Sequence, residues 1–338
     1  MTKVAINGLG RIGRATLRIL VDRADLKLVA VNDIVPLENL VYLVRYDTVF
    51  GRFQKSLEQR DDSTLVIDGQ EIRFLQKKNP EELPWKEMGV ELVFECSGVF
   101  THREGMEKHL KAGARHVILS APIKGNSVPT VVHGVNEIDA SEPLRSCASC
   151  TTNCITPIAE IMKRRLGVKK ALMTTTHAYT STQDIVDGPS KKLRRGRAAA
   201  QNLVPTTTGA AKATGKALPD YEGYFDGVAV RAPVPIASIS DLTFVTERQT
   251  SVEEVNNIFR EEATTERYDG ILGVSEEEIV SSDIIGDPRA SIVDLAMTRV
   301  VDGDLVKVMS WYDNEWGYSM QMVKEAESIV KHVTGVSA

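Results

Sequence analysis

A cysteine at the start of a predicted helix has the residue type and setting best suited to chemistry. Residues 146–154 read SCASCTTNC, and apolar residues at helical spacing follow them up to a basic stretch at 163–165. Ser149 is a predicted N-cap, which places Cys150 in the first helical turn. The unpaired amides and the positive dipole end of that turn favour a thiolate, the reactive form of cysteine. We therefore interpret Cys150 as a candidate nucleophile.

A histidine downstream supplies a partner for this thiol. The segment 171–180 is rich in β-branched residues and predicts a strand that carries His177, 27 residues after the cysteine. Taken alone, a histidine is more often structural, and a cysteine is more often a buried apolar filler, as we expect for Cys154 inside the helix. Together, Cys150 and His177 suggest a nucleophile and its general base.

The N-terminal segment carries a dinucleotide-binding fingerprint. Gly8, Gly10 and Gly13 follow a short apolar strand pattern and precede an amphipathic helical pattern, a second strand and Asp33. In this motif the glycines allow a tight turn, close approach of a pyrophosphate and close packing of helix on strand, while the helix N-terminus faces the phosphates. Asp33 would accept hydrogen bonds from ribose hydroxyls and repel a 2′-phosphate, which favours NAD over NADP.

Further strand patterns extend this half of the chain. Residues 91–96 and 116–120 predict buried strands separated by helical stretches, as in a mostly parallel, doubly wound sheet. An Asp-Gly turn within 64–74 predicts a small antiparallel insertion. Ligands gather at the C-terminal ends of such strands, so Ser97 and Ser120 are candidates to line a cofactor cleft; ordinary turn chemistry is the equal alternative.

The pattern changes after Cys150 to an α+β arrangement. Alternating strands of a one-sided sheet are predicted at 227–231, 240–246 and 305–311. The expected fold class is therefore α/β, with an N-terminal Rossmann-type dinucleotide-binding domain plus an α+β catalytic domain whose sheet is largely antiparallel or mixed. We predict the dinucleotide-binding domain at 1–149, completed by a C-terminal helix at 315–338, and the catalytic domain at 150–314.

Composition narrows the functional classes. The 338 residues are 26% charged and 42% hydrophobic with a net charge of −5, so nucleic acid and anionic membranes are not expected as primary partners. No apolar run approaches the length of a bilayer span, and the N-terminus does not resemble a signal peptide. The four cysteines form neither a disulfide framework nor a zinc pattern, so we expect a cytoplasmic protein without a metal.

Two loops have anion-binding character. The basic run 191–197 is compatible with a solvated face, a nucleic-acid patch or an ordered loop that handles anions, although it is short for nucleic acid. The hydroxyl-rich turn 205–211 precedes a helical pattern, and it suggests either a phosphate site or an ordinary helix start.

With these motifs in place, the chain resembles the phosphorylating glyceraldehyde-3-phosphate dehydrogenases over nearly its whole length. The shared motifs are AINGxGRIGR at 5–14, ASCTTNC at 148–154, HAYT at 177–180, LRRGRAA at 193–199, PTTTGAAKA at 205–213 and WYDNEWGY at 311–318. The set as a whole is highly specific.

The resemblance implies a mechanism. Cys150 attacks the aldehyde of D-glyceraldehyde 3-phosphate to give a thiohemiacetal, and His177 takes a proton as hydride leaves for the nicotinamide, giving a thioester. Inorganic phosphate then cleaves the thioester to 1,3-bisphosphoglycerate, and the reaction is reversible. The implied cofactor is NAD, with NADP as a weaker alternative.

The resemblance also implies site residues and an assembly. The substrate phosphate is assigned to Thr180 and Arg231, because the guanidinium suits a bidentate phosphate contact. The attacking phosphate is assigned to Ser149, Thr151, Thr208 and Gly209. The remaining cofactor contacts are assigned to Arg11 and Ile12 along the phosphates and to Asn314 and Tyr318 at the nicotinamide. A homotetramer is expected, with the loop 191–197 near the cofactor at a subunit interface.

Four positions depart from the family pattern, of which Leu9, in place of a usual phenylalanine, is expected to have little consequence. Cys147 stands where asparagine is usual, either as a tolerated substitution or as a thiol that pairs with Cys150 under oxidation. Thr182 replaces a common aspartate in the substrate-phosphate loop, and Gly188 replaces a bulky residue before a retained proline.

Two rival functions are weighed against this one. The sister enzyme acting on erythrose 4-phosphate is less similar at Asp33 and at 206–209. A non-catalytic nucleic-acid-binding or scaffold protein is disfavoured by the acidic net charge and by the retained Cys150 and His177.

Overall fold

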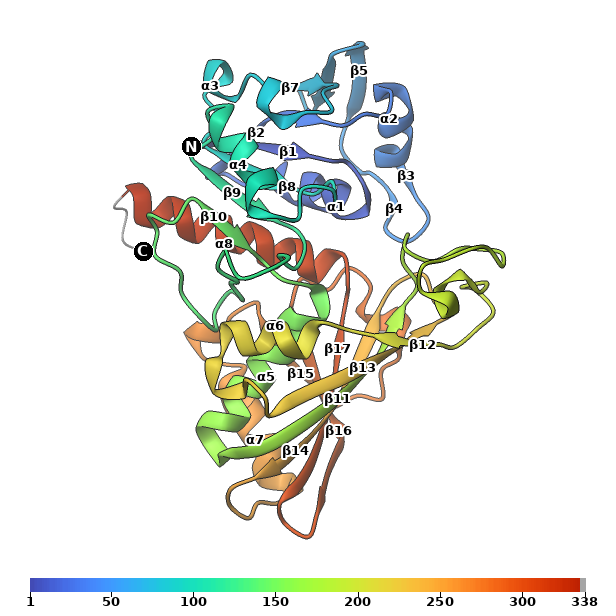
Figure 1. The fold of residues 1–338 in the computed structure, drawn as a ribbon, viewed down its shortest axis with the longest axis vertical. Coiled ribbons are helices and arrows are strands. Elements are labelled where there is room, and N and C mark those ends of the chain that lie inside the picture. The colour runs from blue at the N-terminus through green and yellow to red at the C-terminus, as the bar shows by residue number, and fades with distance from the viewer. Residues whose placement is uncertain (335–338) are drawn as a thin grey trace. The chain divides into compact units, whose positions relative to one another are not determined.

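The computed structural model describes residues 1–334 and divides into two compact units (Figure 1). The first unit consists of Met1–Val131, Glu137–Ala148 and the chain from Ser319 onwards; the second consists of Val132–Asn136 and Ser149–Tyr318. The last four positions of the helix predicted at 315–338 lie outside the described residues.

The first unit is built on an eight-stranded sheet with the strand order β10-β9-β8-β1-β2-β7-β6-β5. Six neighbouring strands, β10 through β7, pair in parallel, and β6 and β5 complete the sheet in antiparallel pairing. The strands are β1 (Thr2–Asn7), β2 (Leu26–Asn32), β5 (Leu57–Asp61), β6 (Thr64–Ile67), β7 (Gln70–Leu75), β8 (Leu92–Glu95), β9 (His116–Leu119) and β10 (Leu144–Ser146). The predicted doubly wound sheet and its antiparallel insertion are confirmed.

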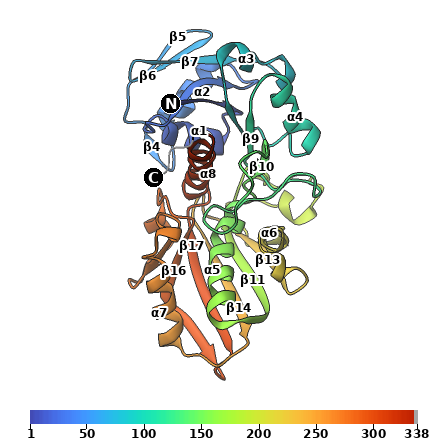
Figure 2. The same cartoon turned by 90° about the vertical axis from the view of Figure 1, so that its left-hand side faces the viewer.

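Helices and one short hairpin complete the first unit. The helices are α1 (Arg11–Leu20), α2 (Leu37–Arg45), α3 (Trp85–Met88), α4 (Arg103–Lys111) and most of α8 (Trp316–Thr334), and the hairpin pairs β3 (Tyr46–Asp47) with β4 (Gly51–Arg52). Helix α8 lies beside α1 in both views, and Arg23, just after α1, forms an ion pair with Glu327 at 3.5 Å (Figure 2). A buried ion pair between Arg145 of β10 and Glu325, 2.7 Å long, also holds α8 to this unit.

The second unit is built on a seven-stranded mixed sheet with the order β12-β13-β11-β14-β17-β16-β15. The pairs β11–β13 and β15–β16 are parallel, and the other neighbours are antiparallel, which confirms the predicted mixed sheet. The strands are β11 (Val168–Ala178), β12 (Val204–Thr207), β13 (Phe225–Ala232), β14 (Ser238–Thr246), β15 (Leu272–Ser275), β16 (Ser291–Val301) and β17 (Leu305–Tyr312). No strand was predicted at β15 or β16.

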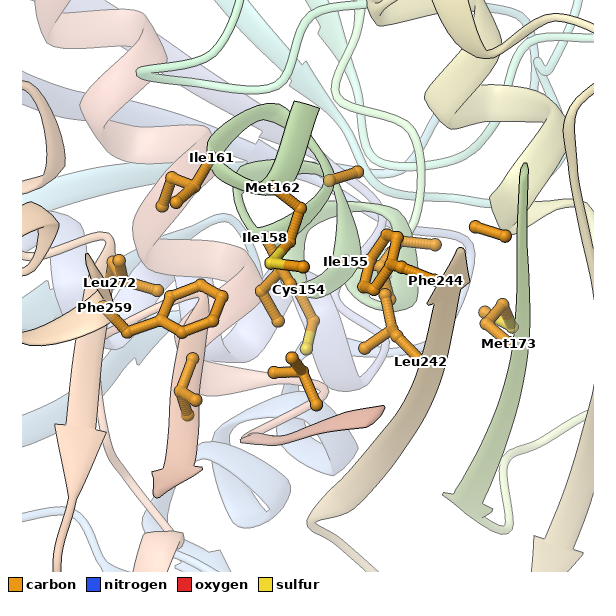
Figure 3. Close-up of a cluster of buried hydrophobic side chains, with 14 of the residues drawn as sticks. Cys154, Ile155, Ile158, Ile161, Met162, Met173, Leu242, Phe244, Phe259 and Leu272 are labelled. Carbon is orange, nitrogen blue, oxygen red and sulfur yellow. The ribbon is translucent and has the colours of Figure 1, made fainter. Parts of the chain in front are cut away.

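Helix α5 (Cys150–Leu166) forms the centre of the core of the second unit, and α6 (Ala210–Ala217) and α7 (Val252–Glu262) pack beside it. Figure 3 shows side chains of α5, including Ile155, Ile158 and Met162, directed towards the sheet residues Leu242 and Phe244. Cys154 is fully buried in this cluster, as predicted for a cysteine that acts as an apolar filler. The candidate nucleophile, Cys150, is therefore the first residue of a helix that packs against the whole core of the second unit.

Candidate active site

The helix that carries Cys150 begins where its sequence predicts. Ser149 is the N-cap of α5, and its Oγ accepts a hydrogen bond from the backbone N–H of Thr152 at 3.1 Å. Ala148, the residue before the cap, is buried and has a φ of 53°, the left-handed region that most residues avoid. This sharp entry brings Cys150 to the first turn of the helix, where it is only partly covered.

The second unit brings the predicted base to the predicted nucleophile. His177 lies near the end of β11, and its Nε2 is 3.4 Å from Cys150 Sγ. Its Nδ1 is 2.7 Å from the carbonyl oxygen of Ala178, which can only accept, so Nδ1 carries the proton in that hydrogen bond. This tautomer leaves Nε2 unprotonated and facing the thiol.

Burial and the neighbouring Arg231 together determine the electrostatics around the histidine. Arg231 lies on β13, directly opposite His177 of the neighbouring strand β11. Its Nη1 lies 2.9 Å from the Ala178 oxygen and 2.8 Å from His177 Nδ1. Burial, and then the charge of Arg231, lower the pKa of His177 to about 3. Arginine can only donate, so the 2.8 Å contact between Arg231 Nη1 and His177 Nδ1, taken alone, would favour the tautomer in which Nδ1 is unprotonated. The Ala178 oxygen, however, can accept from Arg231 Nη1 and from His177 Nδ1 at the same time. The lowered pKa keeps the imidazole neutral at pH 7.

The protonation state of Cys150 differs from the prediction based on its helix position. Burial raises the pKa of the thiol to about 11, although the charge of Arg231 and hydrogen bonds with Thr151 act in the opposite direction. The predicted stabilisation by the helix start is present but smaller than the cost of removing a thiolate from water. The helix start by itself therefore does not make Cys150 a thiolate, because burial holds the pKa of the thiol above its ordinary value.

Tyr312, at the end of β17, supports the pair, although sequence patterns did not identify it. Its ring meets that of His177 edge to face, with centroids 6.0 Å apart. Its hydroxyl lies 2.9 Å from Thr151 Oγ1 and 2.8 Å from Thr175 Oγ1, so one buried phenol joins α5 to β11. Only its position in the WYDNEWGY motif indicated importance.

The residues predicted to bind phosphate carry donors in the same unit. Arg231 Nε is buried, and no described residue accepts a hydrogen bond from it, so this guanidinium retains an unused donor. Thr180 Oγ1 lies 2.9 Å from Thr182 Oγ1. Arg195, which sequence analysis placed only in the basic run, extends the group: its Nε donates to Thr206 at 3.0 Å, and its Nη1 is 3.5 Å from Thr182 Oγ1.

The predicted second phosphate site includes a helix start. Gly209 is the N-cap of α6, and Thr208 Oγ1 accepts a hydrogen bond from the N–H of Ala210 at 3.1 Å. The two helix starts belong to one packed pair, because Thr156 of α5 and Thr214 of α6 share a hydrogen bond of 2.9 Å between their hydroxyls. Of the four residues predicted for the attacking phosphate, Ser149 and Thr151 thus lie at the start of α5, and the other two at the start of α6.

The first unit contains a cavity of about 490 Å³ where a dinucleotide is predicted. Gly8, Gly10, Asp33 and Ser97 contribute to its lining. The other residues that line the cavity are Asn7, Asn32, Ile34, Val35, Lys77, Lys78, Cys96, Val99 and Phe100. Of the predicted cofactor residues in this unit, Arg11, Ile12, Gly13 and Ser120 do not belong to the lining given by the described residues.

The glycines fit the roles that the fingerprint gives them. Gly8 has a φ of +94°, and a Cβ there would lie 2.6 Å from the backbone of Ser97. A Cβ on Gly13 would lie 1.9 Å from the Gly8 carbonyl oxygen, so this glycine is required for helix α1 to pack on the turn. A Cβ on Gly10 would have no atom within 4 Å and Gly10 borders the cavity, so the open space is available to a ligand.

Asp33 is held at the cavity wall by the backbone. Its Oδ2 accepts from the N–H of Leu9 at 2.7 Å, and its Oδ1 accepts from the N–H of Val35 at 3.0 Å. Each carboxylate oxygen keeps a further lone pair for a ribose hydroxyl. Arg11, in contrast, forms an ion pair with Asp47 and stacks over Phe50 with its guanidinium 5.4 Å from the ring centroid. The residues of this cavity fit an NAD-type dinucleotide.

The other two predicted cofactor residues, Asn314 and Tyr318, lie in the second unit and are 4% and 3% exposed. Asn314 Oδ1 accepts a hydrogen bond of 3.1 Å from Ser238. Asp313, beside it, caps the start of α8 by accepting from the N–H groups of Glu315 and Trp316, both at 2.8 Å.

Three further features bear on the earlier expectations. Burial raises the pKa of Cys147 well above its ordinary value and that of Cys154 to about 12, so neither is poised as a thiolate. Among residues 1–334, no group of three metal-ligating His, Cys, Asp or Glu side chains comes together. In the same part of the chain, no helix has the length and apolar character needed to cross a membrane.

Comparison with known proteins agrees with this geometry. The family description "Glyceraldehyde 3-phosphate dehydrogenase, NAD binding domain" matches residues 2–103, and "Glyceraldehyde 3-phosphate dehydrogenase, C-terminal domain" matches residues 149–314. The chain is 48% identical over 335 residues to glyceraldehyde-3-phosphate dehydrogenase of Thermotoga maritima, covering 98% of this chain and 100% of the relative. It is 46% identical over 326 residues to that of Streptomyces coelicolor, covering 95% and 96% respectively. It is 43% identical over 338 residues to that of Clostridium pasteurianum, covering 98% and 99%.

Proposed function

The chain belongs to the glyceraldehyde-3-phosphate dehydrogenase family, and from this we propose that it catalyses the NAD-dependent, reversible oxidative phosphorylation of D-glyceraldehyde 3-phosphate to 1,3-bisphosphoglycerate in glycolysis and gluconeogenesis. The observation that carries the proposal is the 3.4 Å approach of His177 Nε2 to Cys150 Sγ beside the cationic Arg231. A nucleophile, a base and a cation in one place are the parts needed for covalent attack on an aldehyde that carries an anionic group.

The first step joins the substrate to the enzyme. Cys150 Sγ forms a bond to the aldehyde carbon, and its proton passes through His177 Nε2 to the former aldehyde oxygen, giving a thiohemiacetal. This transfer is needed because Cys150 rests as a thiol with a pKa of about 11. His177 supports this role by its position: Nε2 lies 3.4 Å from Cys150 Sγ, and burial together with the charge of Arg231 keeps the imidazole neutral, so that its Nε2 lone pair faces the thiol.

Oxidation and phosphorolysis complete the reaction. NAD, when bound, accepts the hydride that leaves the substrate carbon. His177 takes the hydroxyl proton of the thiohemiacetal at Nε2, so that the carbon becomes the acyl carbon of a thioester with Cys150. An oxygen of inorganic phosphate then bonds to that carbon, the C–S bond breaks, and Cys150 Sγ leaves as the group that His177 reprotonates. The product is an acyl phosphate.

The anion subsites follow from the donors present. We assign the substrate phosphate to Thr180 and Arg231, with Arg195 as an additional cation that holds the same loop to Thr206. We assign the attacking phosphate to Ser149, Thr151, Thr208 and Gly209, at the starts of α5 and α6. This second assignment places the attacking phosphate at the positive ends of two helices.

The cofactor assignment uses the cavity of the first unit. The turn is shaped by three glycines, Gly8, Gly10 and Gly13, and the helix that follows it begins with Arg11 and Ile12. Asp33 binds the adenosine ribose, and Ser97 contributes to the cavity wall. Ser120 has the weakest support because it does not line the cavity. We assign Asn314 and Tyr318 to the nicotinamide. The carboxylate of Asp33 supports NAD as the preferred cofactor and NADP as a poorer one.

We propose that the functional form is a cytoplasmic homotetramer. Support comes from large apolar side chains that the single chain leaves uncovered on the second unit. On the sheet these are Leu172 of β11 and Val228 of β13, 65% and 53% exposed. In the loop that follows β11 they include Ile185 and Leu193, 81% and 85% exposed. Exposed apolar patches of this kind mark protein contacts. Light scattering measures the mass of the particle in solution; we expect the mass of four chains, and the mass of one chain would contradict the proposal.

Initial rates test the catalytic proposal. NAD and NADP are each supplied with glyceraldehyde 3-phosphate, with and without inorganic phosphate, and erythrose 4-phosphate is measured in parallel. We expect turnover that requires phosphate, prefers NAD and favours the three-carbon aldehyde. Preference for the four-carbon aldehyde would assign the protein to the sister activity. Absence of turnover after reduction of Cys150, together with salt-dependent RNA binding, would favour a non-catalytic role.

A further inference from the structure

One buried hydroxyl in the second unit bonds to both a backbone group next to the base and a side chain assigned to the cofactor. Ser238 is the first residue of β14 and is 2% exposed. Its Oγ accepts a hydrogen bond from the N–H of Ala178 at 3.1 Å and lies 3.1 Å from Asn314 Oδ1. Ala178 follows His177 directly. The hydroxyl therefore links the end of the strand that carries the base to the turn after β17.

The local backbone holds Ser238 in this place. Ala237, the preceding residue, is buried and has a φ of 70°, a left-handed conformation that a residue with a Cβ adopts only when its surroundings require it. The β14 strand then pairs with β17 so that Ser238 is opposite Tyr312, two residues before Asn314. The position of the serine is thus set by the backbone on both sides.

The chemistry of the two hydrogen bonds allows only one direction. A backbone N–H can only donate, so the Ser238 oxygen accepts from Ala178; the Asn314 atom that faces the hydroxyl is Oδ1, which can only accept, so the Ser238 proton is donated to it. An amide that accepts on Oδ1 directs its Nδ2 to the opposite side. No residue in the described part of the chain accepts from Asn314 Nδ2, so this donor is available to a ligand.

We propose that Ser238 is a positioning residue that fixes the amide orientation of Asn314, so that Nδ2 donates to the carboxamide oxygen of the nicotinamide. The inference rests on the proposed function and deepens it. Without the serine hydroxyl, Asn314 Oδ1 loses the hydrogen bond that it accepts, and the amide can present either a donor or an acceptor. The expected consequence is weaker discrimination at the carboxamide oxygen, with no change in the chemistry of Cys150.

The strand also supplies a matched control. Ser240 lies two residues further along β14, is fully buried, and bonds to neither Ala178 nor Asn314 within residues 1–334. Removing its hydroxyl changes the buried strand by the same atom as removing that of Ser238. Because Ser240 Oγ has no hydrogen-bond partner among residues 1–334, Ser240→Ala controls for the loss of a buried oxygen atom from β14, and Ser238→Thr, which keeps the hydroxyl, controls for the loss of the hydrogen bonds.

The test compares NAD with thionicotinamide adenine dinucleotide, in which sulfur replaces the carboxamide oxygen and accepts hydrogen bonds poorly. The ratio of kcat/KM for the two cofactors is measured in the wild type, Ser238→Ala, Ser238→Thr, Ser240→Ala and Asn314→Ala. We expect Ser238→Ala to lose about tenfold in kcat/KM with NAD and much less with the analogue, the effect of one buried hydrogen bond. Its ratio should approach that of Asn314→Ala, while Ser240→Ala keeps the wild-type ratio and Ser238→Thr recovers part of it.

The outcomes separate this inference from the function beneath it. If the wild type shows no phosphate-dependent turnover with NAD, the proposed function fails and the ratio has no meaning. If the wild type is active but Ser238→Ala keeps the wild-type ratio, or Ser240→Ala loses it equally, the positioning role of Ser238 is wrong. Alkylation of Cys150 by iodoacetamide at the wild-type rate in Ser238→Ala would show that the thiol and its surroundings are intact.

Discussion

The Nε2 atom of His177 lies 3.4 Å from the Sγ atom of Cys150, although the two residues are 27 positions apart on a strand and a helix. Each is placed by a different element of the second unit: Cys150 by the capped start of α5, and His177 by the end of β11. Arg231, opposite His177 on β13, adds positive charge that lowers the pKa of both groups. The pair thus places a partly covered thiol beside a neutral imidazole, and we propose that the two exchange a proton when the substrate binds.

Replacing the nucleophile separates catalysis from cofactor binding. In Cys150→Ser we expect kcat to fall by about 10³ or more, because an alcohol is a far weaker nucleophile than a thiol at neutral pH. The dissociation constant of NAD should remain near that of the wild type, since the dinucleotide cavity belongs to the first unit. Steady-state rates and a calorimetric titration with NAD measure the two quantities. Residual turnover within tenfold of the wild type would contradict the assignment.

Removing the cation beside the pair changes the reactivity of the thiol. Arg231 lowers the pKa of Cys150 and of His177, so both pKa values should rise in Arg231→Leu. A higher thiol pKa means less thiolate at every pH below it, and alkylation of Cys150 by iodoacetamide between pH 7 and pH 10 should therefore become slower. Arg248→Leu is the control, because that exposed arginine pairs with Glu254 instead. Faster alkylation in Arg231→Leu would overturn the predicted direction.

Cofactor choice depends on the carboxylate at the end of β2. In Asp33→Ala, the ratio of kcat/KM for NADP to that for NAD should rise about tenfold, because hydrogen bonds to the ribose and repulsion of the 2′-phosphate are lost together. Asp33 also accepts from the N–H groups of Leu9 and Val35, so Asp33→Asn is measured as a companion that keeps one acceptor oxygen. Unchanged discrimination in both variants would exclude the proposed role of this residue.

Two glycines of the fingerprint should fail for different reasons when alanine replaces them. A methyl group at Gly13 meets the Gly8 carbonyl oxygen at 1.9 Å, so Gly13→Ala should lower the free energy of unfolding by roughly 1–3 kcal/mol or more. A methyl group at Gly10 meets nothing and projects beside the cavity, so Gly10→Ala should keep the thermal midpoint but weaken NAD binding. Thermal unfolding and NAD titration of both proteins distinguish these effects; equal loss of stability would contradict the distinction.

Local features of this protein could be predicted from sequence because neighbours in the chain determine them. The cap at Ser149 and the helix that starts at Cys150 depend on residues within a few positions, and the structure has both. The turn at Gly8 and the strands around it follow from the same kind of short-range pattern. Family motifs extended the prediction to phosphate and cofactor residues, which remain proposals until the experiments above are done.

What depends on residues distant in the chain was decided only by the tertiary structure. The protonation state of Cys150 was predicted wrongly, because the helix start can be read locally, whereas the burial that raises the pKa depends on the packing of the whole unit. The contacts of Tyr312, Arg195 and Ser238 could not be predicted for a related reason: each has partners that only sheet pairing or loop packing brings near. Sequence alone therefore identified the candidate nucleophile and base, and the fold determined their charge, their hydrogen bonds and the residues that surround them.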